Sequence, residues 1–197
     1  LAGVAGPGDL PALLRLLETT NEAALIDEVQ KGVVASARQM TPADAGAKAL
    51  VDAMKTSAHP ERIIEVLPLV GGPQALAALV ERFNGPDIKG TAFRGLVAWR
   101  GPEASERLLA IYVAGEPAYR DQAFNGFVRQ VGSSSLPAEQ RVLQVRKALG
   151  AATTARERRA LVRALGGMKT YQAFLVAASY LNNAELANDA ASAVMRI

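Results

Sequence analysis

The sequence predicts an all-α protein, a right-handed solenoid of about six helical hairpins with no β-sheet. Alanine and leucine, the strongest helix formers, dominate a chain of 197 residues in which half of the residues are hydrophobic. An apolar helix, a short polar turn and a second apolar helix recur about every 30 residues. Glycine and proline separate these helices, and no segment alternates apolar and polar residues as a strand would.

The repeats form one expected domain over residues 1–197, and each repeat contributes one hairpin. The expected repeats lie near residues 9–40, 42–72, 73–101, 102–132, 137–166 and 168–197.

The second helix of four repeats is expected to end at a glycine, since glycine accepts the left-handed conformation just past a helix. These glycines are Gly71, Gly101, Gly132 and Gly166, spaced by 30, 31 and 34 residues. A large apolar residue stands five places before each of them: Val66, Leu96, Phe127 and Leu161. Together with positions −8, −4 and −1 they form one helical face, which predicts the core. Arg158, at position −8 of its repeat, interrupts this face and predicts a small shift there.

Prolines predict where the helices begin, because proline is favoured in the first turn of a helix. The expected starts are Pro42, Pro60, Pro73, Pro86, Pro102, Pro117 and Pro137. Pro68 is the exception. It lies within a second helix and predicts a kink or an early end there.

Composition excludes several classes of site. The chain has no cysteine, which rules out disulfides, thiolate zinc sites and a cysteine nucleophile. A net charge of +3 is too small by itself to argue for nucleic acid. No segment approaches the roughly 18 apolar residues that a membrane span needs. Leu1 is not a methionine and Ile197 lies inside an apolar helical pattern, so we interpret the chain as a piece of a longer protein.

The agreement of period, helix ends and core positions resembles the HEAT-repeat family of armadillo-like α-solenoids over nearly the whole chain. Family members act as scaffolds, bind proteins, peptides or nucleic acid, or accompany an enzyme domain. The segment 161–197 is also similar to HEAT segments of large bacterial proteins, where they precede a hydrolase domain of the 3-keto-disaccharide type. The resemblance implies an accessory role beside a carbohydrate-active domain. It also implies export to the periplasm or the cell exterior.

Residues able to do chemistry are few, so we predict no enzyme activity, metal or cofactor for this chain. His59 is the only histidine and lies in a turn before Pro60, where a solvated or capping role is favoured. Asp27 and Glu28 are adjacent, so on a helix they diverge by about 100°. HEAT-like DNA glycosylases use several tryptophans to cradle a base, and this chain has only Trp99. A HEAT-like lyase or glycosylase is kept as an alternative.

The face opposite the core of the second helices is the candidate partner-binding surface, because a solenoid commonly binds on the concave side that these helices line. Positions −10, −7 and −3 share this face. Its candidate residues are Arg94, Gln122, Asn125, Arg129, Arg156, Arg159 and Arg163. Trp99, two places before Gly101, is a further candidate because it is expected to be half-exposed at the edge of the core.

Charge is uneven along the chain and bears on the partner. Residues 1–35 carry two basic and five acidic side chains, whereas residues 136–169 carry eight basic and two acidic ones. The basic segment predicts either a solvated face with arginines paired to a neighbouring helix, or a surface for a polyanion. We expect a non-catalytic scaffold that binds a protein or a linked domain of the same chain. A polyanionic ligand is an alternative, and nucleic acid is less favoured.

Overall fold

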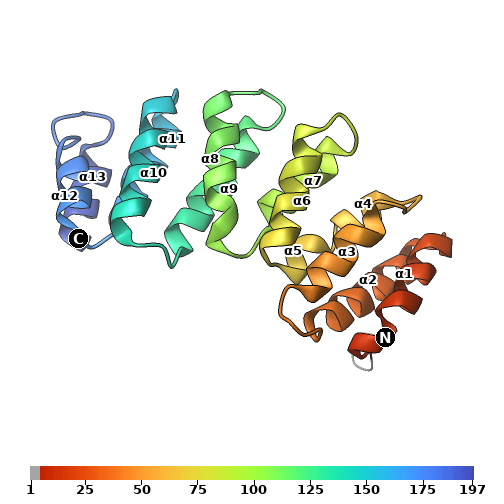
Figure 1. Ribbon diagram of the computed structural model, residues 1–197. Helices are drawn as coiled ribbons and strands as arrows, with labels where there is room; N and C mark the ends of the chain where they lie inside the picture. The colour runs from red at the N-terminus through yellow and green to blue at the C-terminus, as the bar shows by residue number, and fades with distance from the viewer. Residues whose placement is uncertain (1–4) are drawn as a thin grey trace. The chain divides into compact units, whose positions relative to one another are not determined.

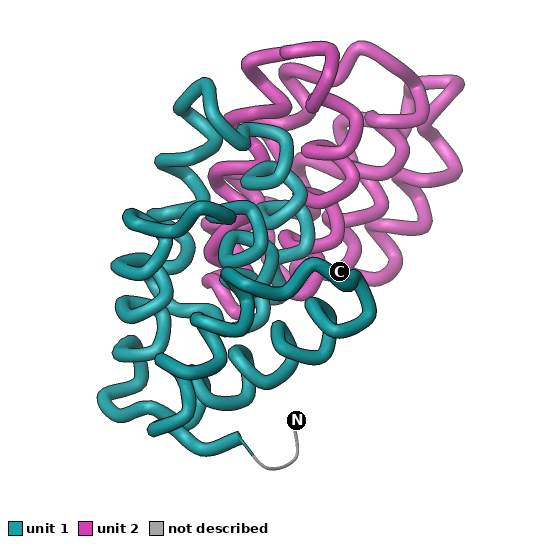
Figure 2. The backbone as a smooth tube through the Cα atoms, turned by 90° about the vertical axis from the view of Figure 1, so that its right-hand side faces the viewer, with its two compact units in different colours: residues 1–100 teal, residues 101–197 magenta. Residues whose placement is uncertain are grey.

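The computed structural model describes residues 5–197, and these residues are helical with no β-strand among them. The prediction of an all-α chain is confirmed. The chain divides into two compact units, unit 1 (residues 1–100) and unit 2 (residues 101–197), coloured teal and magenta in Figure 2. The border falls between the third and fourth expected repeats, and the single repeat domain stays a prediction.

Unit 1 packs its helices in two layers, and Figure 1 shows them side by side in chain order. In one layer α3 contacts α6, and in the other α5 contacts both α2 and α7. Between the layers α1 packs on α2 and α6 packs on α7. The elements are η1 (Pro7–Asp9), α1 (Leu10–Thr19), α2 (Ala23–Arg38), α3 (Ala45–Met54), α4 (Pro60–Ile64), α5 (Leu67–Val70), α6 (Pro73–Asn84) and α7 (Lys89–Ala98).

Unit 2 repeats the two-layer pattern. In one layer α10 contacts α8 and α12, and in the other α11 contacts α9 and α13. The pairs α8–α9, α10–α11 and α12–α13 join the layers. The elements are η2 (Pro102–Ala104), α8 (Ser105–Ala114), α9 (Arg120–Ser133), α10 (Ala138–Ala151), α11 (Ala155–Leu165), α12 (Tyr171–Ala178) and α13 (Ala187–Arg196).

Among the residues that the structure describes, no helix combines the length and the apolar character that crossing a membrane requires.

The core lies where the apolar face of the second helices predicts it. All four residues at position −5 are buried, and so are the three apolar residues at position −8. Val97 and Val128, at position −4, are only half-buried, which places them at the edge of the face. Arg158 is half-buried and donates from Nη2 to the carbonyl of Ala152 at 3.2 Å, so this side chain bonds the chain just past α10 instead of entering the core.

The predicted glycine ends are right at Gly71 and Gly166 and wrong at Gly101 and Gly132. Gly71 follows α5 with a φ of 81°, a left-handed conformation that favours glycine. Gly101 lies beyond the end of α7 at Ala98, and Gly132 lies inside α9. Gly166 follows α11 in a right-handed conformation. A Cβ there would approach the Cα of Ala193 to 3.1 Å, so close packing against α13 explains this glycine.

The predicted helix starts are right at Pro60 and Pro73, which occupy the first position of α4 and α6. Pro102 opens η2, and Pro137 directly precedes α10. The starts at Pro42, Pro86 and Pro117 are wrong by three residues, because a turn separates each proline from α3, α7 and α9. The break expected at Pro68 is confirmed, since α4 ends at Ile64 and α5 begins at Leu67.

Candidate functional site

Six of the candidate residues lie on two helices of unit 2 that contact each other. Gln122, Asn125 and Arg129 are on α9, and all three are exposed. The arginines on α11 are exposed as well: Arg156, Arg159 and Arg163. Because α9 packs against α11 in the same layer, these six side chains form one surface, which we call the arginine face.

A carboxylate of α13 neutralises part of the arginine face. Asp189 accepts from Nε of Arg163 at 2.6 Å and lies 4.0 Å from Nε of Arg159. Arg159 also donates to the carbonyl of Glu185 at 3.2 Å. Arg156 makes no hydrogen bond or ion pair within residues 5–197, so its charge is available to a partner.

Arg94 is exposed on α7 of unit 1. Its Nη2 donates to the hydroxyl of Thr91 at 3.0 Å and lies 3.8 Å from Oε1 of Glu65. Both groups of this ion pair are about half-exposed, and such pairs on a surface contribute little to stability.

The prediction that Trp99 is half-exposed and can contact a partner is wrong. Its side chain is 4% exposed, so the indole presents almost no surface to a partner. The chain leaves α7 at Ala98 and turns to an extended conformation at Trp99, which rotates the side chain away from the position that a continued helix would give it. The prediction failed because it placed the end of the helix at Gly101.

An ionic cluster that the sequence analysis did not single out lies inside unit 2. The carboxylate of Glu157, which is 5% exposed, accepts from Nη1 of Arg120 at 2.5 Å. The backbone amides of Thr153 and Thr154 donate to the same carboxylate at 2.8 and 3.1 Å. The guanidinium of Arg120 also lies 4.6 Å from the centroid of the Tyr112 ring, within range of a cation–π interaction.

The electrostatics of this cluster follow from burial and hydrogen bonding. Burial of Glu157 alone would raise the pKa of its carboxyl. The hydrogen bonds from Arg120, Thr154 and Thr153 outweigh burial and lower that pKa to about 2. Burial, with the charge of Glu157 nearby, raises the pKa of Tyr112 to about 12. The cluster is therefore a charged pair at neutral pH and joins α9 to α11.

Two signals in the sequence could have found Glu157. The run from Thr154 to Glu157 has the spacing of a capping box, and the structure contains that box. Glu157 also stands nine places before Gly166, where the preceding repeats place Ala92 and Ala123, both fully buried. A carboxylate at a buried alanine position requires a partner, and Arg120 supplies it.

Residues with catalytic or metal-binding chemistry do not gather within the described part of the chain. No group of three or more histidine, cysteine, aspartate or glutamate residues there could hold a metal ion. His59 precedes α4 in a turn, as expected, and its Nδ1 lies 3.2 Å from Oε1 of Glu61.

Comparison with family models, with curated proteins and with solved structures found no significant match. The relation to HEAT repeats therefore rests on the pattern of this chain and stays a prediction.

Proposed function

We propose that this chain is a HEAT-like α-solenoid that works as a non-catalytic interaction module and binds an acidic surface of a partner protein through the arginine face. The single observation that carries the proposal is the exposure of that face on the adjacent helices α9 and α11, with Arg156 unpaired among residues 5–197. A cation that is not neutralised within its own unit can attract an acidic partner and orient it.

The repeat interpretation is supported by the contacts within each unit. Five of the six expected repeats contain one pair of α-helices, and the repeat near residues 42–72 contains α3 followed by the short helices α4 and α5. Equivalent helices of neighbouring pairs contact each other in both layers of unit 2. Side-by-side packing of equivalent helices produces an extended surface of the kind on which repeat proteins bind partners.

Site-specific photo-crosslinking tests the proposed function. A benzophenone amino acid replaces Asn125 on the arginine face or, as a control, the exposed Lys147 on α10, and each protein is irradiated in an extract of its native cells. We expect a protein adduct of defined mass from position 125 that weakens as salt rises. Arg156→Glu should abolish the adduct, and position 147 should not give it. No adduct at position 125, or the same adducts at both positions, would contradict the proposal.

Nucleic acid is the second candidate, because four arginines also suit a phosphate backbone. A titration with a labelled duplex or single-stranded oligonucleotide at several salt concentrations distinguishes the two. Tight binding that falls steeply with salt would favour nucleic acid over a protein as the ligand. Charge reversal at Arg129, Arg159 and Arg163 should then abolish that binding. Buried Trp99 argues against the HEAT-like glycosylase alternative, which needs accessible aromatic side chains.

The accessory role beside a carbohydrate-active domain belongs to the same proposal. It rests on the resemblance of residues 161–197 and on no contact in the structure. The sequence of the whole gene product tests it: a hydrolase-like domain after the segment that ends at Ile197 would support the role, and its absence would oppose it.

A further inference from the structure

Exposed apolar side chains gather on the helices of unit 2 that do not carry the arginine face. Leu143 of α10 is 61% exposed, and Tyr171 and Leu175 of α12 are 71% and 43% exposed. An exposed apolar group of this kind commonly marks an interaction site. These residues lie on α10 and α12, which contact each other in the layer opposite α9 and α11. Leu175 lines the groove between the two helices, whereas Leu143 and Tyr171 lie outside it.

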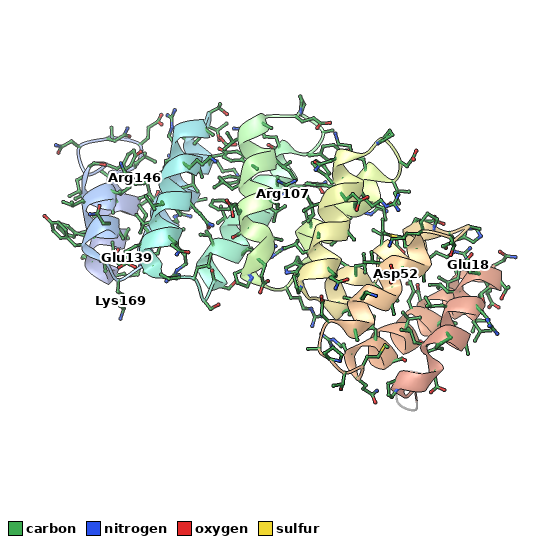
Figure 3. The ribbon with its side chains drawn as sticks, viewed as in Figure 1. Glu18, Asp52, Arg107, Glu139, Arg146 and Lys169 are labelled. Atoms are coloured by element: carbon green, nitrogen blue, oxygen red, sulfur yellow. The ribbon has the colours of Figure 1, made fainter. Side chains whose placement is uncertain are left out.

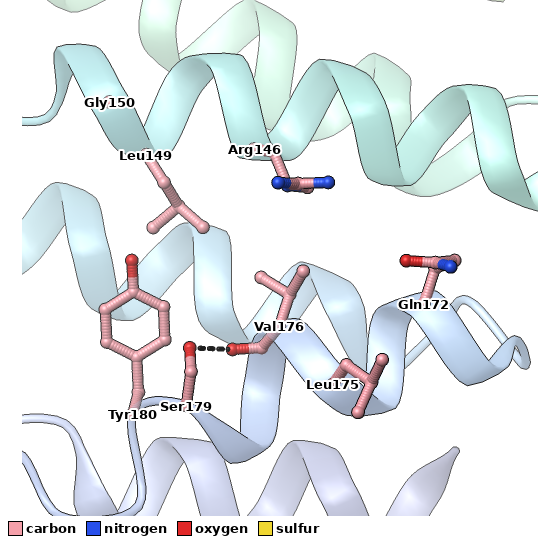
Figure 4. Close-up of a pocket in the computed structure, with 8 residues that line it drawn as sticks. All are labelled: Arg146, Leu149, Gly150, Gln172, Leu175, Val176, Ser179 and Tyr180. Carbon is pink, nitrogen blue, oxygen red and sulfur yellow. Dashed lines mark hydrogen bonds between the residues drawn. The ribbon is translucent and has the colours of Figure 1, made fainter.

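A groove of about 460 Å³ runs between α10 and α12. Figure 4 shows Arg146 and Leu149 entering it from α10 and Val176 pointing toward them from α12, and Leu175 of α12 also lines it. Gln172 and the Tyr180 hydroxyl add polar groups at its sides (Figure 4).

The groove carries positive charge and no negative charge. Arg146 is exposed and makes no hydrogen bond or ion pair within the described residues. None of the residues that line the groove is acidic, and α12 has no charged residue at all. Glu139 is the only carboxylate of α10 and lies seven residues before Arg146, about 10 Å along the helix (Figure 3). An occupant therefore gains by bringing a carboxylate to Arg146.

The dimensions suit a helix. From Gln172 to Ser179 the groove follows α12 for about 10 Å, which is two turns of a helix laid beside it. Two packed helices offer ridges and grooves that a third helix can fill, and the described residues contain no strand edge to which an extended peptide could add.

We propose that the groove between α10 and α12 binds an amphipathic helix of a partner protein. The apolar side of that helix packs on Leu149, Leu175 and Val176, and a carboxylate beside it pairs with the guanidinium of Arg146. This surface is separate from the arginine face, so either one can bind without the other.

A synthetic helical peptide tests the groove with the full chain. The peptide is labelled and has about 18 residues, enough to populate a helix in water. It carries leucines at helical spacing with glutamates beside them. Binding is measured by fluorescence anisotropy. Arg146→Glu should weaken binding at least about tenfold by replacing attraction with repulsion, and Leu175→Asp should weaken it by a similar factor.

Lys147→Glu is the matched control, because it makes the same charge change at the neighbouring exposed residue, which does not line the groove. It should change the affinity by less than about twofold, since salt screens a charge outside the contact. A peptide with lysine in place of glutamate should bind the Arg146→Glu chain better than the native chain.

Three outcomes would overturn the proposal. The first is no binding of the glutamate peptide at a concentration of about 1 mM, the weak end of the affinity scale. The second is an equal loss in the Arg146→Glu and Lys147→Glu chains, which would show general charge attraction only. The third is self-association in sedimentation velocity that Arg146→Glu abolishes, which would make a second copy of the chain the occupant.

Discussion

Units 1 and 2 both use an arginine to join one helical pair to another, but the two arginines meet different partners. In unit 1, Arg62 of α4 donates from Nη1 to the carbonyls of Leu17 and Thr20, at the end of α1, at 2.5 and 2.8 Å. In unit 2, Arg120 of α9 donates from Nη2 to the carbonyl of Ala151, at the end of α10, at 3.1 Å. Each arginine thus satisfies carbonyls that a helix end leaves without partners.

The difference is a buried carboxylate. Arg62 meets neutral carbonyl oxygens at this site, whereas Arg120 also pairs with Glu157. A bond to a neutral carbonyl does not change in mild acid, because only the arginine is ionisable and it stays charged. A buried ion pair depends on both charges and is costly to break from one side. The contrast predicts that the two units respond differently to substitution and to acid.

Removal of the carboxylate should have the largest effect. Glu157→Ala leaves the Arg120 guanidinium largely buried without its counter-charge. We expect the free energy of local unfolding of helices α9 and α11 to fall by about 3–5 kcal/mol. Hydrogen exchange resolved by helix measures this opening, because parts of a folded protein open locally with free energies of their own. Exchange in α1–α5 should stay unchanged.

Tyr112→Phe is the control within the same cluster, because it keeps the aromatic ring over which Arg120 lies. The buried Tyr112 hydroxyl makes no hydrogen bond within residues 5–197, so we expect its removal to change the opening free energy by less than about 1 kcal/mol. Equal losses in the Tyr112 and Glu157 variants would show that the Tyr112 hydroxyl matters as much as the ion pair, which would contradict this assignment.

A fall in pH should have the next largest effect, because it should lower the stability of unit 2 more than that of unit 1. The pKa of Glu157 is lowered from 4.5 to about 2 in the folded chain, so the unfolded chain binds the proton more readily. The stability that this group contributes is complete above about pH 4.5, and it is lost as the pH falls toward 2. The shift corresponds to about 3 kcal/mol in unit 2.

Urea unfolding followed by circular dichroism between pH 6 and pH 2.5 measures this loss, with Glu157→Gln as the reference chain. The Gln chain should lose less stability over the same range, because it lacks this ionisable group. The same pH dependence in both chains would refute the assignment. In unit 1 the lowered pKa values belong to Glu28 and Asp52, which lysines stabilise on the exposed surface, where solvent weakens the interaction.

Replacing Arg62 should have the smallest of these effects. Arg62→Met keeps much of the aliphatic length but leaves the carbonyls of Leu17 and Thr20 without their donor. We expect a loss of about 2 kcal/mol in the opening free energy of α1–α5, the usual size for hydrogen bonds to a charged group. Hydrogen exchange at pH 7 and pH 4.5 checks this. A loss that depended strongly on pH would show that a carboxylate takes part in unit 1 as well.

The arginine face shows which properties of a binding surface can be predicted from residue patterns and which cannot. The period of the second helices predicted that Gln122, Asn125, Arg129 and the α11 arginines are exposed, and they are. The pattern left open whether arginines pair with a neighbouring helix. Asp189 and Arg163 are 26 residues apart, and the packing of α13 on α11 brings them together. No pattern of neighbouring residues in the sequence predicts such a contact.

The groove between α10 and α12 was not predicted for the same reason. Its apolar residues fit the helical pattern of each helix taken alone, and only the spacing of two neighbouring helices creates a volume between them. The prediction for Trp99 failed for a different reason, an error in a local boundary. A three-residue error in the end of α7 changed an expected half-exposed indole into a buried one.

The sequence by itself determined that the chain is helical, where several of its helices begin or end, and which residues at position −5 enter the core. These properties depend on helix propensity, on the conformations of glycine and proline, and on a period of 3.6 residues, all of which act over a few neighbouring residues. Only the tertiary structure decided that Glu157 meets Arg120, that Asp189 neutralises part of the arginine face, and that α10 and α12 enclose a groove. Those features depend on the distance between helices far apart in the chain, and the packing of the two layers sets that distance.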